Sequence, residues 1–66
     1  MILTIRQWRG ARGKTQWEMA ELLGVHINTY QKWERNPKII DVCHAQKLAK
    51  IFEVDINDID FTEGAT

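Results

Sequence analysis

The stretch "AELLGVHINTYQKWE", residues 20–34, decides the fold of this chain. Its first four residues favour a helix, Gly24 interrupts it, and residues 27–35 predict another helix after only a Gly-Val turn. A turn of three or four residues that contains glycine sends the next helix off at roughly 90–120°, which is the helix-turn-helix arrangement. The helix after the turn then buries a single stripe, and we expect Tyr30 and Trp33 to form it, with Ile27 three residues back.

The polar residues of that helix indicate what it does. Asn28, Thr29, Gln31 and Lys32 are short or flexible hydrogen-bonding side chains on a rod that would project from the molecule. An α-helix fits the major groove of DNA, and such side chains match the donors and acceptors of base edges. Asn and Thr also tolerate an exposed helix start without any function, so on their own they leave both interpretations open.

The whole sequence predicts an all-α domain of five short helices around one core, with no strand. The helices are expected after residue 4, after residue 15, at about 27–35, after residue 41 and as a last turn at 56–61. Thr15 and Glu18 have the spacing of a capping box, in which each side chain bonds the other residue's backbone N–H. The expected N-caps are Thr4, Thr15, Asp41 and Asp55.

The ends of the helices and the core follow from similar patterns. Gly13 and Gly24 are expected just past the first two helices, and Asn36 is expected to end the third in the left-handed conformation before Pro37. In the first helix, Ile5, Trp8 and Ala11 (or Arg12) are expected on one side. The other apolar positions expected to face the core are Met19, Ala20, Leu22, Leu23, Tyr30, Trp33, Val42, Ala45, Leu48, Ala49 and Phe52.

Length and composition allow one small soluble domain. We assign residues 1–62 to it and expect residues 63–66 to be a frayed tail. No apolar run approaches the roughly 18 residues of a membrane span, and the start is too short and too early charged for a signal peptide. A single cysteine, Cys43, excludes an internal disulfide and suits a reducing cytosol, so we expect a cytoplasmic protein.

The charges are unevenly distributed, although the net charge is zero. Residues 1–38 hold seven basic and three acidic residues, a balance of +4. Residues 39–66 hold two basic and six acidic residues, a balance of −4. This asymmetry favours a basic working face backed by an acidic C-terminal half.

The segment "KTQWEMAELLGVHINTYQKWER" resembles the phage repressor and Cro-like helix-turn-helix family, also called XRE-type. The matching positions are Arg12-Gly13, Thr15-Gln16, Met19-Ala20, Leu23-Gly24-Val25 and Trp33-Glu34-Arg35-Asn36, and the resemblance continues through "AQKLAKIFEVDINDI". It covers about residues 5–60. It implies a compact five-helix DNA-binding domain of the lambda-repressor type, with residues 27–35 as the recognition helix.

The resemblance also implies roles for single residues. Those expected to contact DNA bases are Ile27, Asn28, Gln31 and Lys32. Those expected to contact the DNA backbone are Lys14, Thr15, Gln16, Trp17, Arg35 and Lys38. Gln16, at the start of the second helix, is also expected to brace the recognition helix. Three positions depart from the pattern. His26 replaces the usual Ser or Thr N-cap, Ile27 could only pack on a thymine methyl, and Asn36 replaces the glycine after the third helix.

Two further sets of contacts are expected within and between chains. Arg9 and Glu34 occupy positions that face each other between the first and third helices in some of these repressors, so we expect a structural ion pair. The last turn carries Ile56, Ile59 and Phe61, which one small domain is not expected to cover completely. These three residues are the expected contact of a weak homodimer that pairs on DNA.

Other chemistry has little support. His26, Cys43 and His44 lack the spacing of a zinc site, and nucleophilic catalysis would need a cleft that a domain of 66 residues does not provide. We therefore expect no enzyme activity, metal, cofactor, membrane partner or small-molecule ligand. The preferred function is a sequence-specific double-stranded DNA-binding regulator of prokaryotic or phage origin, with a repressor as the first choice. The alternative is a protein-interaction module on the same fold, such as an antitoxin or inhibitory partner.

Overall fold

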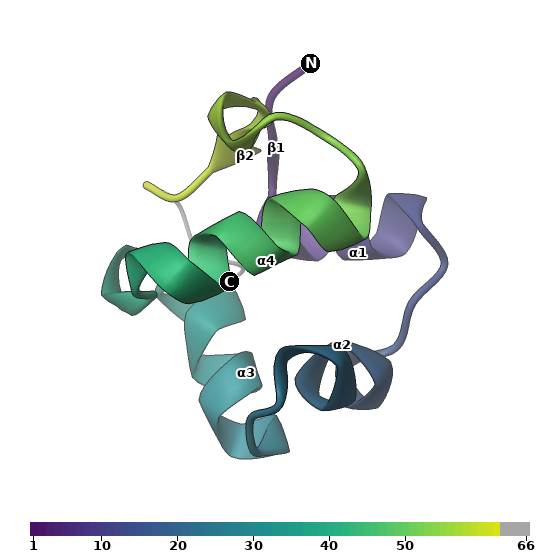
Figure 1. The fold of residues 1–66 in the computed structure, drawn as a ribbon, viewed down its shortest axis with the longest axis vertical. Helices are drawn as coiled ribbons and strands as arrows, with labels where there is room; N and C mark the ends of the chain where they lie inside the picture. The colour runs from purple at the N-terminus through teal and green to yellow at the C-terminus, as the bar shows by residue number, and fades with distance from the viewer. Residues whose placement is uncertain (63–66) are drawn as a thin grey trace.

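The computed structural model describes residues 1–62 as a small helical domain with a helix-turn-helix at one end (Figure 1). The expected tail, residues 63–66, lies outside the described residues. Helices α2 and α3 lie together at this end, α4 packs beside α1, and two very short strands pair at the opposite end. The elements in chain order are β1 (Leu3–Thr4), α1 (Ile5–Ala11), α2 (Gln16–Leu23), α3 (Ile27–Arg35), the 3₁₀-helix η1 (Pro37–Ile39), α4 (Val42–Phe52), the 3₁₀-helix η2 (Ile56–Asp58) and β2 (Ile59–Asp60).

The helix starts and the first two helix ends confirm the predictions from the sequence. The Thr15 hydroxyl accepts the N–H of Glu18 while the Glu18 carboxylate accepts the N–H of Thr15, which completes the capping box. Gly13 and Gly24 have φ of 67° and 69°, the left-handed conformation that favours glycine after a helix. The side chains of all four predicted N-caps accept a backbone N–H of the following turn: Thr4, Thr15, Asp41 and Asp55.

The prediction of five helices and no strand is wrong. Four α-helices are present in residues 1–62, and the predicted fifth is one 3₁₀ turn followed by a two-residue strand. That strand, β2, pairs in parallel with β1, with Leu3 opposite Ile59 and Thr4 opposite Asp60. Two residues are too few to produce the alternation by which a strand is recognised in a sequence, so this pairing had no detectable pattern.

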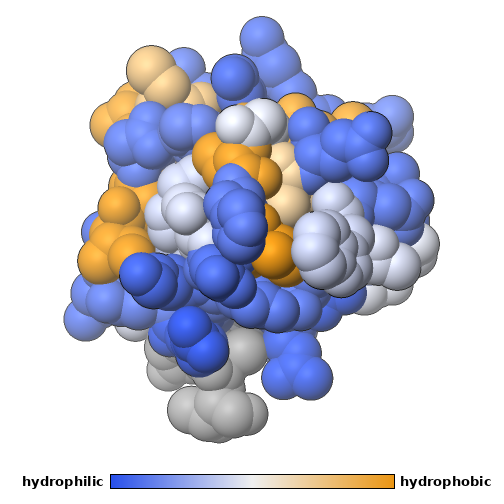
Figure 2. All heavy atoms as spheres, turned by 90° about the horizontal axis from the view of Figure 1, so that it is seen from below, coloured by the Kyte–Doolittle hydropathy of each residue, from blue (hydrophilic) through white to orange (hydrophobic). Residues whose placement is uncertain are grey.

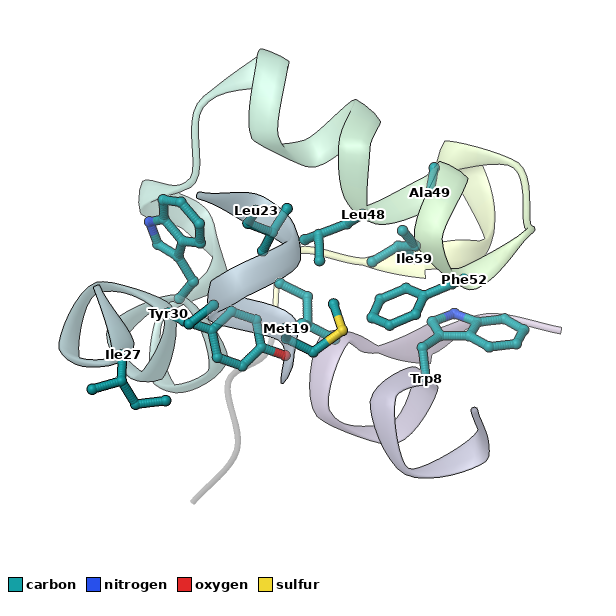
Figure 3. Close-up of a cluster of buried hydrophobic side chains, with 12 residues drawn as sticks. Trp8, Met19, Leu23, Ile27, Tyr30, Leu48, Ala49, Phe52 and Ile59 are labelled. Carbon is teal, nitrogen blue, oxygen red and sulfur yellow. The ribbon is translucent and has the colours of Figure 1, made fainter. Parts of the chain in front are cut away.

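One hydrophobic core joins all four helices. Figure 3 shows side chains from α1, α2, α3, α4 and β2 converging on it. The rings of Trp8 and Phe52 stack with their centroids 6.5 Å apart, and the Trp8 indole N–H donates to the carbonyl of Asp58 at 2.8 Å. Trp8 therefore joins α1 to α4 and to the C-terminal turn.

Three details of the predicted helices are also wrong. Leu22 is 53% exposed and Val42 is 70% exposed, although both were expected in the core. Leu22 is one residue, about 100°, away from the buried stripe of α2, and Val42 opens α4 at the edge of the domain. Asn36 ends α3 with φ of −138° instead of the left-handed conformation. The ring of Pro37 restricts the residue before it to extended backbone conformations.

A buried carboxylate joins the first three helices. Glu34, in α3, is 3% exposed and accepts hydrogen bonds from groups on all three. Arg9 in α1 donates Nε to Glu34 Oε2 at 2.6 Å and Nη2 to Oε1 at 3.5 Å. Gln16 Nε2 in α2 donates to Oε1 at 2.9 Å, and the Tyr30 hydroxyl donates to Oε2 at 2.5 Å. The structure thus brings together the expected pair of Arg9 and Glu34, and adds Tyr30 and Gln16 as further partners of the carboxylate.

The hydrogen bonds determine the charge state of Glu34. Burial alone would raise its pKa, but the bonds from Arg9, Tyr30 and Gln16 more than compensate, so the pKa lies below the ordinary value. The pKa of Tyr30 is raised, first by burial and then by its bond to Glu34. Glu34 is therefore an anion and Tyr30 a neutral donor at neutral pH.

Adjacent leucines of α2 give a matched test of the core. Leu23→Ala should lower the free energy of unfolding by about 2–5 kcal/mol, because it leaves a cavity at a side chain that is 2% exposed. Leu22→Ala, at the exposed neighbour, should change it by less than about 0.5 kcal/mol. Urea denaturation of both variants measures the difference, and equal losses would mean that α2 is rotated about its axis.

The Glu34 network predicts a dependence of stability on pH. Because the pKa of Glu34 is lower in the folded state, its contribution is complete above the ordinary value of 4.5 and is lost as the pH falls through the folded value. Glu34→Gln should remove this loss from denaturation curves taken between pH 7 and 3. At pH 7 it should cost roughly 3 kcal/mol, near the lower end for a broken buried pair, because Arg9 keeps some contact with water.

Glu21→Gln is the control for this experiment, since it removes an exposed carboxylate from α2. It should retain the pH dependence of the parent chain. If Glu34→Gln also retains it, Glu34 does not contribute through the network described above.

Candidate nucleic-acid interface

Helix α3 has a buried apolar side and an exposed polar side. The exposed residues include Asn28, Thr29, Lys32 and Arg35. The opposite side is held in the domain by the four buried residues Ile27, Tyr30, Trp33 and Glu34. Of the residues expected to contact bases, Asn28 and Lys32 are exposed, Gln31 is partly buried and Ile27 is buried.

The burial of Ile27 contradicts the expectation that this residue contacts DNA bases. It is only 8% exposed and belongs to the core cluster, at whose edge it lies in Figure 3. Ile27 lies three residues before Tyr30, a spacing that predicts burial on the same stripe. The structure agrees with this spacing and not with the base contact that the resemblance implies.

His26 is the N-cap of α3, as the departure from the family pattern had suggested. Its Nδ1 accepts the backbone N–H of Asn28 at 3.1 Å. The imidazole therefore takes the place of the usual hydroxyl and satisfies one of the free N–H groups at the helix start.

Gln16 connects the start of α2 with the middle of α3. Its Oε1 accepts from Gln31 Nε2 at 3.1 Å, while its Nε2 donates to Glu34. Each amide nitrogen carries two hydrogens, so Gln31 keeps one N–H and its carbonyl oxygen for another partner. This bond joins a residue expected to contact the DNA backbone to one expected to contact a base. It agrees with the bracing of the recognition helix that the resemblance implies for Gln16.

The other predicted backbone contacts lie near the two ends of this pair of helices. Lys14, Thr15 and Trp17 surround the start of α2, and Arg35 and Lys38 lie at the end of α3 and just beyond it. All except the partly buried Lys14 are exposed. The surface seen from below is hydrophilic over most of its area, with some apolar patches between the polar groups (Figure 2).

The C-terminal turn does not expose all three residues of the predicted dimer contact. Ile59 is 5% exposed and belongs to the core, so the expectation that it contacts a second chain is wrong. The turn folds back because β2 pairs with β1, and this pairing carries Ile59 inward. Ile56 and Phe61 are partly buried against the same core.

A shallow apolar groove of about 410 Å³ lies beside this turn. Its lining includes Pro37, Ile40, Val42, Ala45, Ile56, Ile59 and Phe61. Ile39 and Val42 are exposed near it. An uncovered apolar surface at the C-terminal turn was expected from the sequence. Its extension to Val42 was not expected, because the helical periodicity assigned Val42 to the core.

The residues considered for metal binding have other surroundings. His44 Nδ1 lies 2.5 Å from Asp41 Oδ1, and the bond lowers the pKa of Asp41. The His44 ring lies 4.9 Å from that of Trp33, and Cys43 is exposed. Within residues 1–62, no group of three or more His, Cys, Asp or Glu side chains is arranged to hold a metal ion. The same part of the chain contains no helix that is long and apolar enough to cross a membrane.

Comparison with known proteins gives one match. The model of the helix-turn-helix family matches residues 5–59, which is most of the chain. No curated protein and no solved structure matches it. The matched region begins with α1 and ends with Ile59 in β2, so it includes α2, α3 and their turn. The chain therefore belongs to the XRE-type, Cro and repressor-like helix-turn-helix family of DNA-binding transcription regulators, which is not a family of enzymes.

Proposed function

We propose that the chain is a sequence-specific double-stranded DNA-binding repressor of prokaryotic or phage origin, which acts by occupying an operator. The observation that supports this most is the polar outer side of α3, which is exposed while its other side is fixed in the core. A helix held in this way projects far enough to enter the major groove.

The proposed base contacts are Asn28, Gln31 and Lys32. The carboxamide of Asn28 suits the N6 and N7 groups of adenine, and the ammonium group of Lys32 suits the O6 and N7 acceptors of guanine. Gln31 is held by Gln16 and offers its carbonyl oxygen and one N–H, so we propose that it contacts a base from a fixed position. Ile27 is not included because it is buried.

The proposed backbone contacts are Lys14, Thr15, Gln16, Trp17, Arg35 and Lys38. Arg35 and Lys38 supply exposed positive charge at one end of the helix pair, and the partly buried Lys14 adds a positive charge at the other. The first turn of α2 adds backbone N–H groups, which favour a phosphate at a helix start. Because phosphate contacts carry much of the affinity, this arrangement offsets the zero net charge.

A homodimer would allow such a small domain to bind DNA specifically. A single domain contacts few base pairs, so specific binding is expected to use two half-sites about one helical turn apart. We propose that the apolar groove beside η2, with Val42, Ile56 and Phe61, forms the contact between two copies. The contact is weak, because the acidic residues of the same turn repel each other across a two-fold axis.

The alternative is a protein-interaction module on the same fold, acting as an antitoxin or inhibitory partner. The apolar groove and the acidic C-terminal half are the observations that favour it. Gel retardation of genomic DNA fragments at low salt, beside a pull-down from host lysate, distinguishes the two. Retardation with no retained protein supports DNA binding, and the reverse result supports the alternative.

Substitutions on α3 test the proposed base contacts. On an operator selected from a random DNA pool, Asn28→Ala and Lys32→Ala should each weaken binding by about 1–3 kcal/mol and relax the preference at particular base pairs. Lys50→Ala, which removes an exposed charge from α4, is the matched control and should change binding little. Equal losses by Asn28→Ala and Lys32→Ala on all DNA sequences would restrict both residues to phosphate contacts.

Val42→Asp tests the proposed dimer contact. Val42 is exposed at the first position of α4, where an acidic residue is compatible with the helix, so the fold should be retained. The variant should bind one half-site normally and lose cooperative binding to two, as measured by titration of palindromic and single-site DNA. Leu22→Asp, on another exposed surface, should keep the cooperativity.

A substitution at the buried Ile59 should have a different effect from one at Val42. Ile59→Asp would place a carboxylate in the core, so it should unfold the domain and not only prevent dimer formation. Unchanged cooperativity in Val42→Asp would exclude the groove as the contact between copies.

A further inference from the structure

Trp17 is an unusual residue to find at the surface. Its side chain is 70% exposed, whereas the other two tryptophans, Trp8 and Trp33, are 8% and 6% exposed. Tryptophan is among the more buried residue types on average, and at a surface it is enriched where proteins bind partners. The core does not account for Trp17, since it is the second residue of α2 and points away from the buried stripe.

The surroundings of Trp17 indicate which partner it would contact. The preceding residue, Gln16, is hydrogen-bonded to Gln31 in the middle of α3. The indole therefore belongs to the helical turn that lies beside the proposed base-reading surface. The N–H groups of Gln16 and Trp17 are in the first turn of α2, where a helix provides them with no internal acceptor.

The charges of this turn favour a neutral contact. The carboxylate of Glu18 is fixed by its bond to the Thr15 N–H at 2.8 Å. Its hydrogen bonds to the Thr15 backbone and side chain lower its pKa, so it stays ionised. Its repulsion of phosphates offsets part of the attraction that the free N–H groups and Lys14 exert there. An uncharged aromatic ring avoids this repulsion and packs well on the apolar C–H groups of a deoxyribose.

We propose that Trp17 supplies an uncharged, sequence-independent contact, in which its indole packs on the sugar of the DNA strand that passes the first turn of α2. This inference rests on the proposed DNA-binding function and adds to it the chemistry of one contact. Trp17 would strengthen binding to any duplex and would not discriminate between bases. It would also differ from the lysine and arginine contacts in its response to salt.

The test uses the full chain and a random-sequence DNA duplex of 30 base pairs, with variants Trp17→Gln, Trp17→Phe and Leu22→Gln. Trp17→Gln should weaken binding about tenfold, the effect of losing roughly 55 Å² of buried apolar surface. Trp17→Phe should restore most of the affinity, because it keeps an aromatic ring. Leu22→Gln removes another exposed apolar side chain from α2 and should bind like the parent.

The salt dependence identifies the kind of contact. Each neutralised phosphate contributes about −0.9 to the slope of log K against log salt concentration. Trp17→Gln should keep the slope of the parent, whereas Lys14→Gln should make it shallower. In the parent chain, DNA should also protect the exposed tryptophan fluorescence from acrylamide.

The possible failures are distinguishable. If the parent chain does not bind the duplex at low salt, the proposed function is wrong, and this inference fails with it. If the parent binds but Trp17→Gln binds equally well, or changes the slope, only the inference is wrong. A loss that appears on a selected operator but not on the random duplex would also overturn it, because Trp17 would then contact a base.

Discussion

The carboxylate of Glu34 is the group on which the orientation of α3 depends. It is buried, and it receives hydrogen bonds from Arg9 in α1, Gln16 in α2 and Tyr30 within α3. A buried ion pair is weak evidence for a large net stability, because desolvation offsets most of the attraction. Its effect on geometry is different. Rotation or sliding of α3 would separate the buried charge from its donors on α1 and α2, so alternative packings of α3 are disfavoured even where their apolar contacts are adequate.

This constraint reaches the proposed reading surface through Gln16. One end of its amide is bonded to Glu34 and the other to Gln31, so the core network and the outer side of α3 share a residue. A glutamine side chain in water loses considerable rotational freedom when it binds a base, and a bond formed in advance lowers that loss. The structure therefore favours a pre-ordered Gln31, while Asn28 and Lys32 stay free to adjust.

Much of the fold could be predicted from local features. Caps and glycines depend on hydrogen bonds within one turn, so Thr15, Glu18 and Gly24 indicated their roles without tertiary context. Other features depend on contacts between distant segments. The pairing of β1 with β2 buries Ile59, and neither strand is long enough to be recognised alone. At the site, Gln16 and Glu34 were singled out separately, but only the fold shows that they touch.

The acidic residues explain how a chain of zero net charge is suited to bind a polyanion. Several of them have structural roles: Glu18, Asp41 and Asp55 cap helix starts, and Glu34 is paired with Arg9. At a helix start, the positive end of the helix dipole partly cancels a carboxylate, which weakens its field at a distance. The lysines and arginines around α3 are exposed and mostly outside such arrangements, so their field extends into solvent. The electrostatic asymmetry relevant to DNA therefore comes from what the charges are bonded to, and the net charge gives no indication of it.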